Sequence, residues 1–205
     1  MPDTRVYTWA RQRQDPSAGH DEVVHANMVT LDIIIIAAVT ENGVIGRGNA
    51  LPWRLKSDMA HFRTLTLGKP VALGRKTFQS IGRPLAGRTT IVISHDQNFS
   101  APGIVVAPNF ASALATARGD ALRRNAGAII VAGGADTYVQ ALPLATRLVI
   151  TEVRKRVDGD ARFPAIDPKL WRETVRSAHK PGPDDEAEFA FVTYERVVNV
   201  RPSAA

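Results

Sequence analysis

The sequence contains no cysteine, which excludes disulfide bonds, thiol-ligated metal sites and catalysis by a cysteine nucleophile. It also has no apolar run near the roughly 18 residues that a membrane-spanning helix needs. Its five histidines lack the spacing of a histidine metal motif, so no metal site is predicted. The net charge is +6, but the basic residues are scattered, which favours small anionic ligands over a nucleic-acid-binding patch.

The chain of 205 residues is long enough for one domain with a substantial core. Its first 30 residues are polar and mixed in charge, with no hydrophobic stretch typical of a signal sequence. We therefore expect a disordered extension at residues 1–30, one folded domain at 31–198 and a short tail at 199–205. Met28 directly precedes the first strand-like run and is a candidate start of the functional chain.

Short apolar runs rich in β-branched residues alternate with helical segments, which is typical of a parallel sheet covered on both faces. The final pair of runs flanks the polar turn PGPDD and predicts an antiparallel hairpin. The predicted fold is α/β: a single domain with a central, mostly parallel eight-stranded sheet, an antiparallel C-terminal edge hairpin and about four flanking helices. We expect strands at 33–39, 71–73, 90–93, 104–106, 129–132, 148–153, 171–179 and 189–198, and helices at 58–67, 77–81, 110–117 (with an extension to 124 left open) and 136–142.

Residues 43–53, GVIGRGNALPW, are the most informative segment, and an acid, Asp58, follows them. A glycine-punctuated loop that ends in a proline–tryptophan pair is typical of a mobile loop that closes over a flat ligand. Asp58 falls in the first turn of a predicted helix, near apolar residues that include Trp53 and Phe62. Desolvation there raises the carboxyl pKa and suits the group to proton transfer to a heterocycle. The alternative is that Asp58 only complements the helix dipole.

Two junctions between a strand and a helix have the glycines of a phosphate site: GRKT at 74–77 and GGADT at 133–137. Glycine lets a ligand approach the backbone, and exposed N–H groups at a helix start bind anions. Together the junctions predict a dinucleotide pyrophosphate site, although neither is a GxGxxG fingerprint. Ser94 and His95 follow another strand and can complete, with Arg75, a pocket for an additional phosphate, which favours NADP over NAD.

Taken in order, these motifs resemble those of bacterial dihydrofolate reductases over residues 31–197. The resemblance is carried by IAA at 36–38, residues 46–53, Asp58, Phe62, GRKT at 74–77, SIGRPL at 80–85, GR at 87–88, Gly133, Gly134, Tyr138, Thr151 and DGD at 158–160. It implies NADPH-dependent reduction of 7,8-dihydrofolate to 5,6,7,8-tetrahydrofolate, with hydride added at C6 and a proton at N5. That reaction supports one-carbon metabolism and the synthesis of thymidylate, purines and glycine.

The resemblance also implies a role for individual residues. Asp58 holds the 2-amino group and N3 of the pteridine and promotes protonation at N5 through a water, and Thr151 hydrogen-bonds its carboxylate. Arg88 grips the α-carboxylate of the glutamate tail with its bidentate fork. Residues 46–53 close over the reactants, and Asp160 hydrogen-bonds the backbone of the closed loop.

The residues implied for the site fall into three groups. The catalytic group is Asp58, Thr151, Trp53 and Leu51. The substrate-binding group is Ile36, Ala38, Asp58, Met59, Phe62, Ile81, Arg83, Leu85, Arg88, Ala132, Tyr138 and Thr151, with the carbonyls of Ile36 and Ala132 at the ring edge and Ile81 and Leu85 against the aminobenzoyl part. The NADPH-binding group is Ala38, Ile45, Gly46, Asn49, Ala50, Gly74, Arg75, Lys76, Thr77, Ser94, His95, Gly133, Gly134, Ala135, Asp136 and Thr137.

The resemblance further implies a monomeric, cytoplasmic enzyme with no nucleic-acid or membrane partner, inhibited by antifolates such as trimethoprim or methotrexate. Ala132 departs from the family pattern, which usually has a larger aliphatic residue there, and this widens the predicted site near Tyr138. Ala135 replaces a frequent third glycine, and Leu51 replaces the methionine of some bacterial members. Residues 117–127 form a longer stretch than in compact members.

Two other functions remain open from the sequence. A reductase of the same fold that acts on a ribityl-aminopyrimidine in riboflavin synthesis would share the cofactor site. It should lack the Pro52–Trp53 loop joined to Asp58 and Phe62. A non-catalytic nucleotide- or RNA-binding protein is permitted by the basic charge, but it has no need of a proton route through Asp58 and Thr151.

Overall fold

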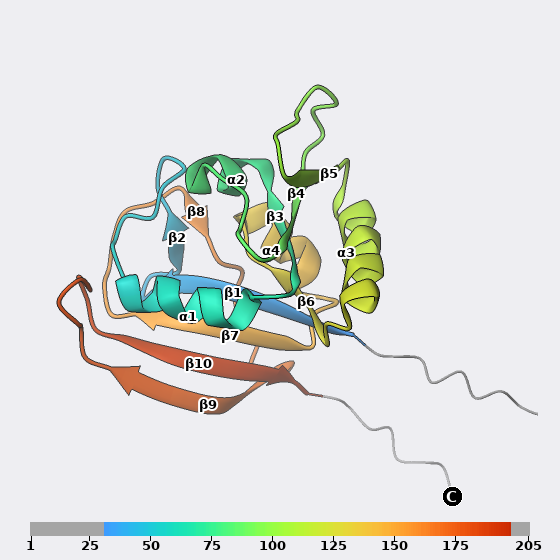
Figure 1. The fold of residues 1–205 in the computed structure, drawn as a ribbon. Coiled ribbons are helices and arrows are strands. Elements are labelled where there is room, and N and C mark those ends of the chain that lie inside the picture. The colour runs from blue at the N-terminus through green and yellow to red at the C-terminus, as the bar shows by residue number, and fades with distance from the viewer. Residues whose placement is uncertain (1–30, 198–205) are drawn as a thin grey trace, which may run out of the picture. The chain divides into compact units, whose positions relative to one another are not determined.

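The computed structural model describes residues 31–197, which form an eight-stranded sheet in the order β5-β4-β3-β6-β1-β7-β10-β9 (Figure 1). The pairs from β5 through to β7 are parallel, whereas β10 is antiparallel to both β7 and β9. The predicted fold class is therefore confirmed. The strands of this sheet are β1 (Asp32–Thr40), β3 (Pro70–Gly74), β4 (Thr89–Ile93), β5 (Ile104–Ala107), β6 (Ala128–Val131), β7 (Arg147–Val153), β9 (Trp171–His179) and β10 (Phe189–Arg196).

Hydrophobic clusters cover both faces of the sheet, as its apolar strands predict. Ile35 of β1 is fully buried in a cluster with residues of α3 and α4, and its neighbour Ile36 joins a second cluster with residues of α1 and α2. Successive side chains of a strand point to opposite faces, so one strand serves both clusters. The helices are α1 (Lys56–Thr66), α2 (Arg75–Ile81), α3 (Phe110–Arg124) and α4 (Ala135–Ala141). None of the helices in residues 31–197 is long and apolar enough to cross a membrane.

The ends of several elements differ from the prediction by one or two residues. Helix α1 begins at Lys56, two residues earlier than predicted, and Asp58 stays in its first turn. Strand β6 ends at Val131, so Ala132 begins the connection to α4. Helix α3 continues to Arg124 and ends at Asn125, which has a left-handed backbone (φ 52°). The long stretch after residue 117 is therefore the second half of this helix and its cap.

Two short strands were not predicted. Strand β2 (Val44–Gly46) pairs antiparallel with β8 (Ala161–Arg162) in a separate small sheet. Strands of two or three residues are too short to show an alternating pattern, and their pairing joins segments more than a hundred residues apart. The expected extension at 1–30, the end of the expected strand at 198 and the tail at 199–205 lie outside the described residues.

Candidate active site

A short hydrogen bond joins the acid of the loop motif to the middle of the sheet. The hydroxyl of Thr151 donates to Asp58 Oδ1 at 2.6 Å. Thr151 lies on β7 and is 2% exposed, whereas Asp58 is the third residue of α1. The pairing of β7 with β1 and the packing of α1 on the sheet bring together two groups 93 residues apart. The proximity implied for this pair is therefore present in the structure.

The surroundings of Asp58 favour its protonated form. Burial raises the pKa of this carboxyl above its ordinary value, the charge of Asp185 raises it further, and the hydrogen bond from Thr151 opposes both. Tyr138 is also buried, and its hydroxyl donates to the carbonyl of Ile36 at 2.8 Å. Burial and the charge of Asp58 raise the Tyr138 pKa well above its ordinary value, so the phenol is a neutral donor.

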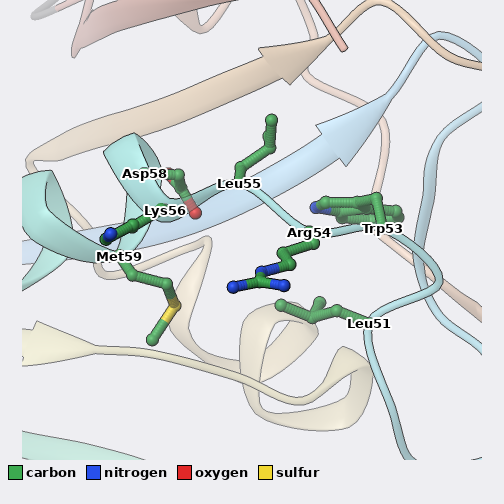
Figure 2. Close-up of a pocket in the computed structure, with 7 residues that line it drawn as sticks. All are labelled: Leu51, Trp53, Arg54, Leu55, Lys56, Asp58 and Met59. Atoms are coloured by element: carbon green, nitrogen blue, oxygen red, sulfur yellow. The ribbon is translucent and has the colours of Figure 1, made fainter. Parts of the chain in front are cut away.

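A pocket of about 280 Å³ opens beside Asp58 (Figure 2). In Figure 2, Asp58 and Met59 come from the start of α1, and Leu51 and Trp53 come from the preceding loop on the opposite side. The remaining lining residues, which the sequence did not predict, are Arg54, Leu55 and Lys56. The pocket is mostly apolar with a carboxyl at its wall, and this suits a flat heterocycle with a few polar atoms.

Trp53 contributes both a buried ring and a free donor to this region. The side chain is 6% exposed, yet its indole Nε1 has no hydrogen-bond partner among the described residues. Buried polar groups normally have a partner, so this N–H keeps an unused capacity to donate a hydrogen bond. Leu51 and Met59 line the same pocket and are about half exposed, at 48% and 57%, which leaves them available to cover a ligand.

The turn between β9 and β10 holds the start of α1, and no local sequence pattern predicts this contact. Asp185 accepts hydrogen bonds from the backbone N–H of Ser57 at 3.0 Å and from its hydroxyl at 2.6 Å. Leu55, at the N-cap position of α1, has no capping side chain, so Asp185 caps the helix from a distant segment. Lys56 adds an ion pair with Asp184 at 2.7 Å.

The glycine-rich loop is tied to the segment that contains β8. The backbone N–H of Gly48 donates to Asp160 Oδ1 at 3.1 Å, the contact implied for the closed loop. The neighbouring Gly159 lies so close to the loop that an added Cβ would be 2.3 Å from Val44 Cγ1 and 2.5 Å from the oxygen of Gly46. A side chain therefore cannot fit at position 159 unless the loop moves.

Arg88 is fixed against α1 by its own contacts. One guanidinium nitrogen donates to Thr66 Oγ1 at 2.8 Å, another donates to the carbonyl of Ala86 at 3.1 Å, and the group lies 5.9 Å from the Phe62 ring centre. Burial and then the charge of Arg63 lower the pKa of Arg88 from its ordinary value. Two nearby arginines make this end of α1 a favourable place for a carboxylate.

The two predicted phosphate junctions meet in the structure. The N–H of Gly74 donates to the carbonyl of Gly133 at 2.8 Å. Gly133 has a φ of 108°, which favours glycine, and a Cβ on Gly134 would be 3.3 Å from Thr77 Oγ1. The two junctions therefore lie against each other, and the side chain of Thr77 packs close to the backbone of both Gly133 and Gly134.

A second pocket of about 400 Å³ contains the other predicted phosphate residues, Ser94 and His95. The guanidinium of Arg75 forms an ion pair with Asp96 of this pocket, with 2.9 Å between Arg75 Nη1 and Asp96 Oδ2. Asp96 is a further site residue that the sequence did not predict. The remaining residues that line this second pocket are Gln97, Phe99, Val106 and Pro108.

Several other residues that the resemblance assigns to the substrate or the cofactor lie away from Asp58. Ile81 is the last residue of α2 and is exposed, Leu85 packs at the edge of the second cluster, and Arg83 is exposed in the turn between them. Asn49 is at the tip of the loop in a left-handed conformation (φ 65°), between the bridge partners Arg47 and Ala50. The structure gives no contact that joins Arg83 or Asn49 to the carboxyl of Asp58.

Comparison with known proteins identifies the family of this chain. Residues 32–196 match the family model for dihydrofolate reductase. The chain is 46% identical over 167 residues to a dihydrofolate reductase of Neisseria meningitidis serogroup A, which covers 81% of this chain and 99% of the relative. It is 42% identical over 166 residues to the type 3 dihydrofolate reductase of Salmonella typhimurium, with coverages of 80% and 98%.

A solved structure supports the same assignment. The dihydrofolate reductase of Enterococcus faecalis, complexed with NADP(H) and RAB-propyl, superposes with a TM-score of 0.75 at 30% identity. The match covers 82% of this chain and 97% of the other. The family model spans all strands of the eight-stranded sheet, and the relatives and the solved structure agree with it on the family. The chain therefore belongs to the dihydrofolate reductase family and is an NADPH-dependent oxidoreductase.

Proposed function

We propose that Asp58 directs the proton of the reaction in which this enzyme reduces 7,8-dihydrofolate to 5,6,7,8-tetrahydrofolate. The observation that carries the proposal is a buried carboxyl beside the pocket, with a raised pKa and a 2.6 Å hydrogen bond from Thr151. The carboxyl holds the 2-amino group and N3 of the pteridine, and it promotes protonation of N5 through a water. The C6–N5 double bond becomes a single bond, because C6 gains a hydride and N5 gains the proton.

Thr151 and Tyr138 keep the Asp58 carboxyl and the pteridine ring of the substrate in position. The Thr151 hydroxyl is a donor, so it fixes the orientation of Asp58 and leaves the second oxygen free for the substrate. Tyr138 remains neutral and holds the carbonyl of Ile36, which faces the ring edge in this proposal together with the carbonyl of Ala132. The small Ala132 widens this part of the site, and we expect it to lower the affinity for some antifolates.

The tail of the substrate lies along α1 toward Arg88. Phe62 packs near the pteridine, Ile81 and Leu85 contact the aminobenzoyl part, and Arg88 binds the glutamate α-carboxylate. The hydrogen bond to Thr66 and the contact with the Phe62 ring hold the Arg88 guanidinium before the substrate arrives. Preorganised groups lose less entropy on binding, so this geometry favours a strong contact.

The loop at 46–53 excludes water from the reactants. Leu51 and Trp53 cover the pocket, and the contact from Gly48 to Asp160 holds the loop in its closed position. A site without bulk water strengthens the electrostatic effect of Asp58 and prevents loss of the proton to solvent.

The glycine junctions and the second pocket form the proposed NADPH site. When bound, NADPH supplies the hydride. Gly74, Thr77, Gly133 and Gly134 face the pyrophosphate, and Arg75, Ser94 and His95 face the additional phosphate. The remaining proposed contacts come from Ala38, Ile45, Gly46, Asn49, Ala50, Lys76, Ala135, Asp136 and Thr137.

The proposal includes a monomer that acts in the cytoplasm, supports one-carbon metabolism and binds antifolates such as methotrexate or trimethoprim. Light scattering of the purified protein and thermal shift with each antifolate test these points.

The direct test of the reaction is the loss of NADPH absorbance after addition of 7,8-dihydrofolate. Oxidation at a turnover of about 1 per second or faster, within the ordinary range of enzymes, supports the proposal. Binding of NADPH without oxidation contradicts it and favours the riboflavin-pathway reductase, which is tested with the ribityl-aminopyrimidine in the same assay.

A further inference from the structure

The pocket proposed for the additional phosphate of NADPH contains a carboxylate. Asp96 lines this pocket with Ser94 and His95, and its Oδ2 is 2.9 Å from Arg75 Nη1. Arg75 is the cation that the proposed site offers to the phosphate. The structure therefore places an anion of the protein against the group that should bind an anion of the cofactor.

Local hydrogen bonds fix the position of Asp96. Its second oxygen, Oδ1, accepts from the N–H of Asn98 at 3.0 Å, and its own N–H donates to Ser94 Oγ at 3.2 Å. Its carbonyl accepts from the N–H of Phe99 at 3.2 Å. The guanidinium of Arg75 also lies 5.9 Å from the Phe99 ring centre, so the same turn holds both partners. Rotation of the carboxylate out of the pocket would break its hydrogen bond from Asn98 and its ion pair with Arg75.

The two nicotinamide cofactors respond differently to such a carboxylate. NADPH has a phosphate on the ribose 2′-oxygen, and a nearby carboxylate repels it and competes for Arg75. NADH has a free 2′-hydroxyl, and dinucleotide sites selective for NAD use an acidic side chain to accept a hydrogen bond from it. Arg75 favours NADPH, and Asp96 favours NADH.

We propose that Asp96 is a specificity-determining residue that weakens the preference of this enzyme for NADPH and permits turnover with NADH. This inference depends on the proposed cofactor site. NADPH remains the preferred cofactor because Arg75, Ser94 and His95 face its phosphate, but the margin over NADH is small because Asp96 shares Arg75 with that phosphate.

The test compares the dissociation constants of NADPH and NADH, measured by quenching of protein fluorescence, for the wild type and the Asp96→Asn variant. Asparagine keeps an acceptor for the Asn98 N–H and removes the charge. We expect Asp96→Asn to bind NADPH on the order of fivefold more tightly, the scale of an exposed charge interaction, and to bind NADH no more tightly than the wild type. Asp96→Ser, which also keeps a short acceptor, should change the ratio in the same direction.

Glu195→Gln is the matched control. Glu195 lies on β10 and pairs with Arg147 of β7, so the substitution removes one surface charge outside the pocket. It should leave the ratio of the two constants unchanged. The difference between Asp96→Asn and the wild type should also shrink in high salt, since mobile ions screen the interaction.

The inference is overturned if Asp96→Asn and Asp96→Ser change the dissociation constants of NADPH and NADH equally, or change neither of them. If the wild type reduces dihydrofolate with NADPH in that case, the proposed function stands and only the role of Asp96 is wrong. If the wild type binds neither dinucleotide, both the cofactor site and the inference are wrong.

Discussion

Asp185 accepts two hydrogen bonds from Ser57, although the two residues lie 128 positions apart in the chain. Ser57 directly precedes Asp58, so the β9–β10 turn fixes the start of the helix that presents this carboxyl. The same turn contributes the carboxylate that raises the Asp58 pKa through its charge. The hairpin at the edge of the sheet is therefore part of the site.

Substitution of Asp185 should separate its charge from its role as a helix cap. Asp185→Asn keeps an acceptor for Ser57 and removes the charge, so we expect the Asp58 pKa to fall and the loss of activity with rising pH to begin at a lower pH. Asp185→Ala also removes the cap and should cost about 1 kcal/mol of unfolding free energy. The measurements are the pH profile of hydride transfer and urea unfolding.

Asp184→Asn is the matched control for this pair of variants. It removes a neighbouring acid that pairs with Lys56, and Asp184 is not among the groups that raise the Asp58 pKa. A pH profile displaced equally by Asp184→Asn and Asp185→Asn would contradict a specific role for Asp185.

Asp58→Asn should increase stability at neutral pH. The folded-state pKa of Asp58 is raised, so the folded protein binds more protons than the unfolded chain between the unfolded pKa and the raised value. Stability is therefore lost as pH rises through that window, and an uncharged asparagine removes the loss. We expect a higher Tm for the variant than for the wild type at pH 7 and a smaller difference near pH 4, measured by thermal unfolding. A lower Tm at both values would contradict the burial of a charged group here.

Arg88→Ala should raise the KM for dihydrofolate with little change in kcat. The lost charge-assisted hydrogen bonds to the substrate carboxylate correspond to about tenfold or more in binding. A dihydropterin without the glutamate tail provides the control, because its KM should be the same for wild type and variant. An equal loss for both substrates would show that Arg88 maintains the fold of this region and does not bind the tail.

Gly159→Ala should displace the loop that covers the pocket. The added Cβ would lie 2.3 Å from Val44 Cγ1. This overlap should push β2 away from Gly159 and from its neighbour Asp160, which holds the loop. We expect slower hydride transfer and a smaller effect on the Tm, since the eight-stranded sheet does not include this contact. Single-turnover rates and thermal unfolding measure the two effects. A single-turnover rate equal to that of the wild type would contradict a role for this loop contact in hydride transfer.

The sequence predicted the parts of the molecule that depend on local pattern. Continuous apolar runs such as β1 showed a sheet buried on both faces, and the order of motifs placed Asp58 in the first turn of α1. Thr151 was identified only through the resemblance, because nothing local distinguishes a threonine in a buried strand. The structure adds the 2.6 Å hydrogen bond that explains why it is needed.

The missed features all depend on contacts between distant segments. Asp185 and Asp96 are acids in polar turns, and such residues are common where no site exists. Their importance follows from what they contact, Ser57 and Arg75, and the packing of the chain decides this. The β2–β8 pair was missed for the same reason, since its strands are too short to have a pattern of their own.

The most direct test of the account is the rate of hydride transfer in a single turnover, measured against pH for the wild type and Asp58→Asn. The wild-type rate should fall as pH rises through the raised pKa of Asp58, because the proton for N5 becomes less available. At pH 7 the variant should be slower by about a hundredfold or more, the scale of general acid catalysis, and it should bind NADPH as the wild type does. A variant with the wild-type rate and pH dependence would contradict the assignment of the proton route to Asp58.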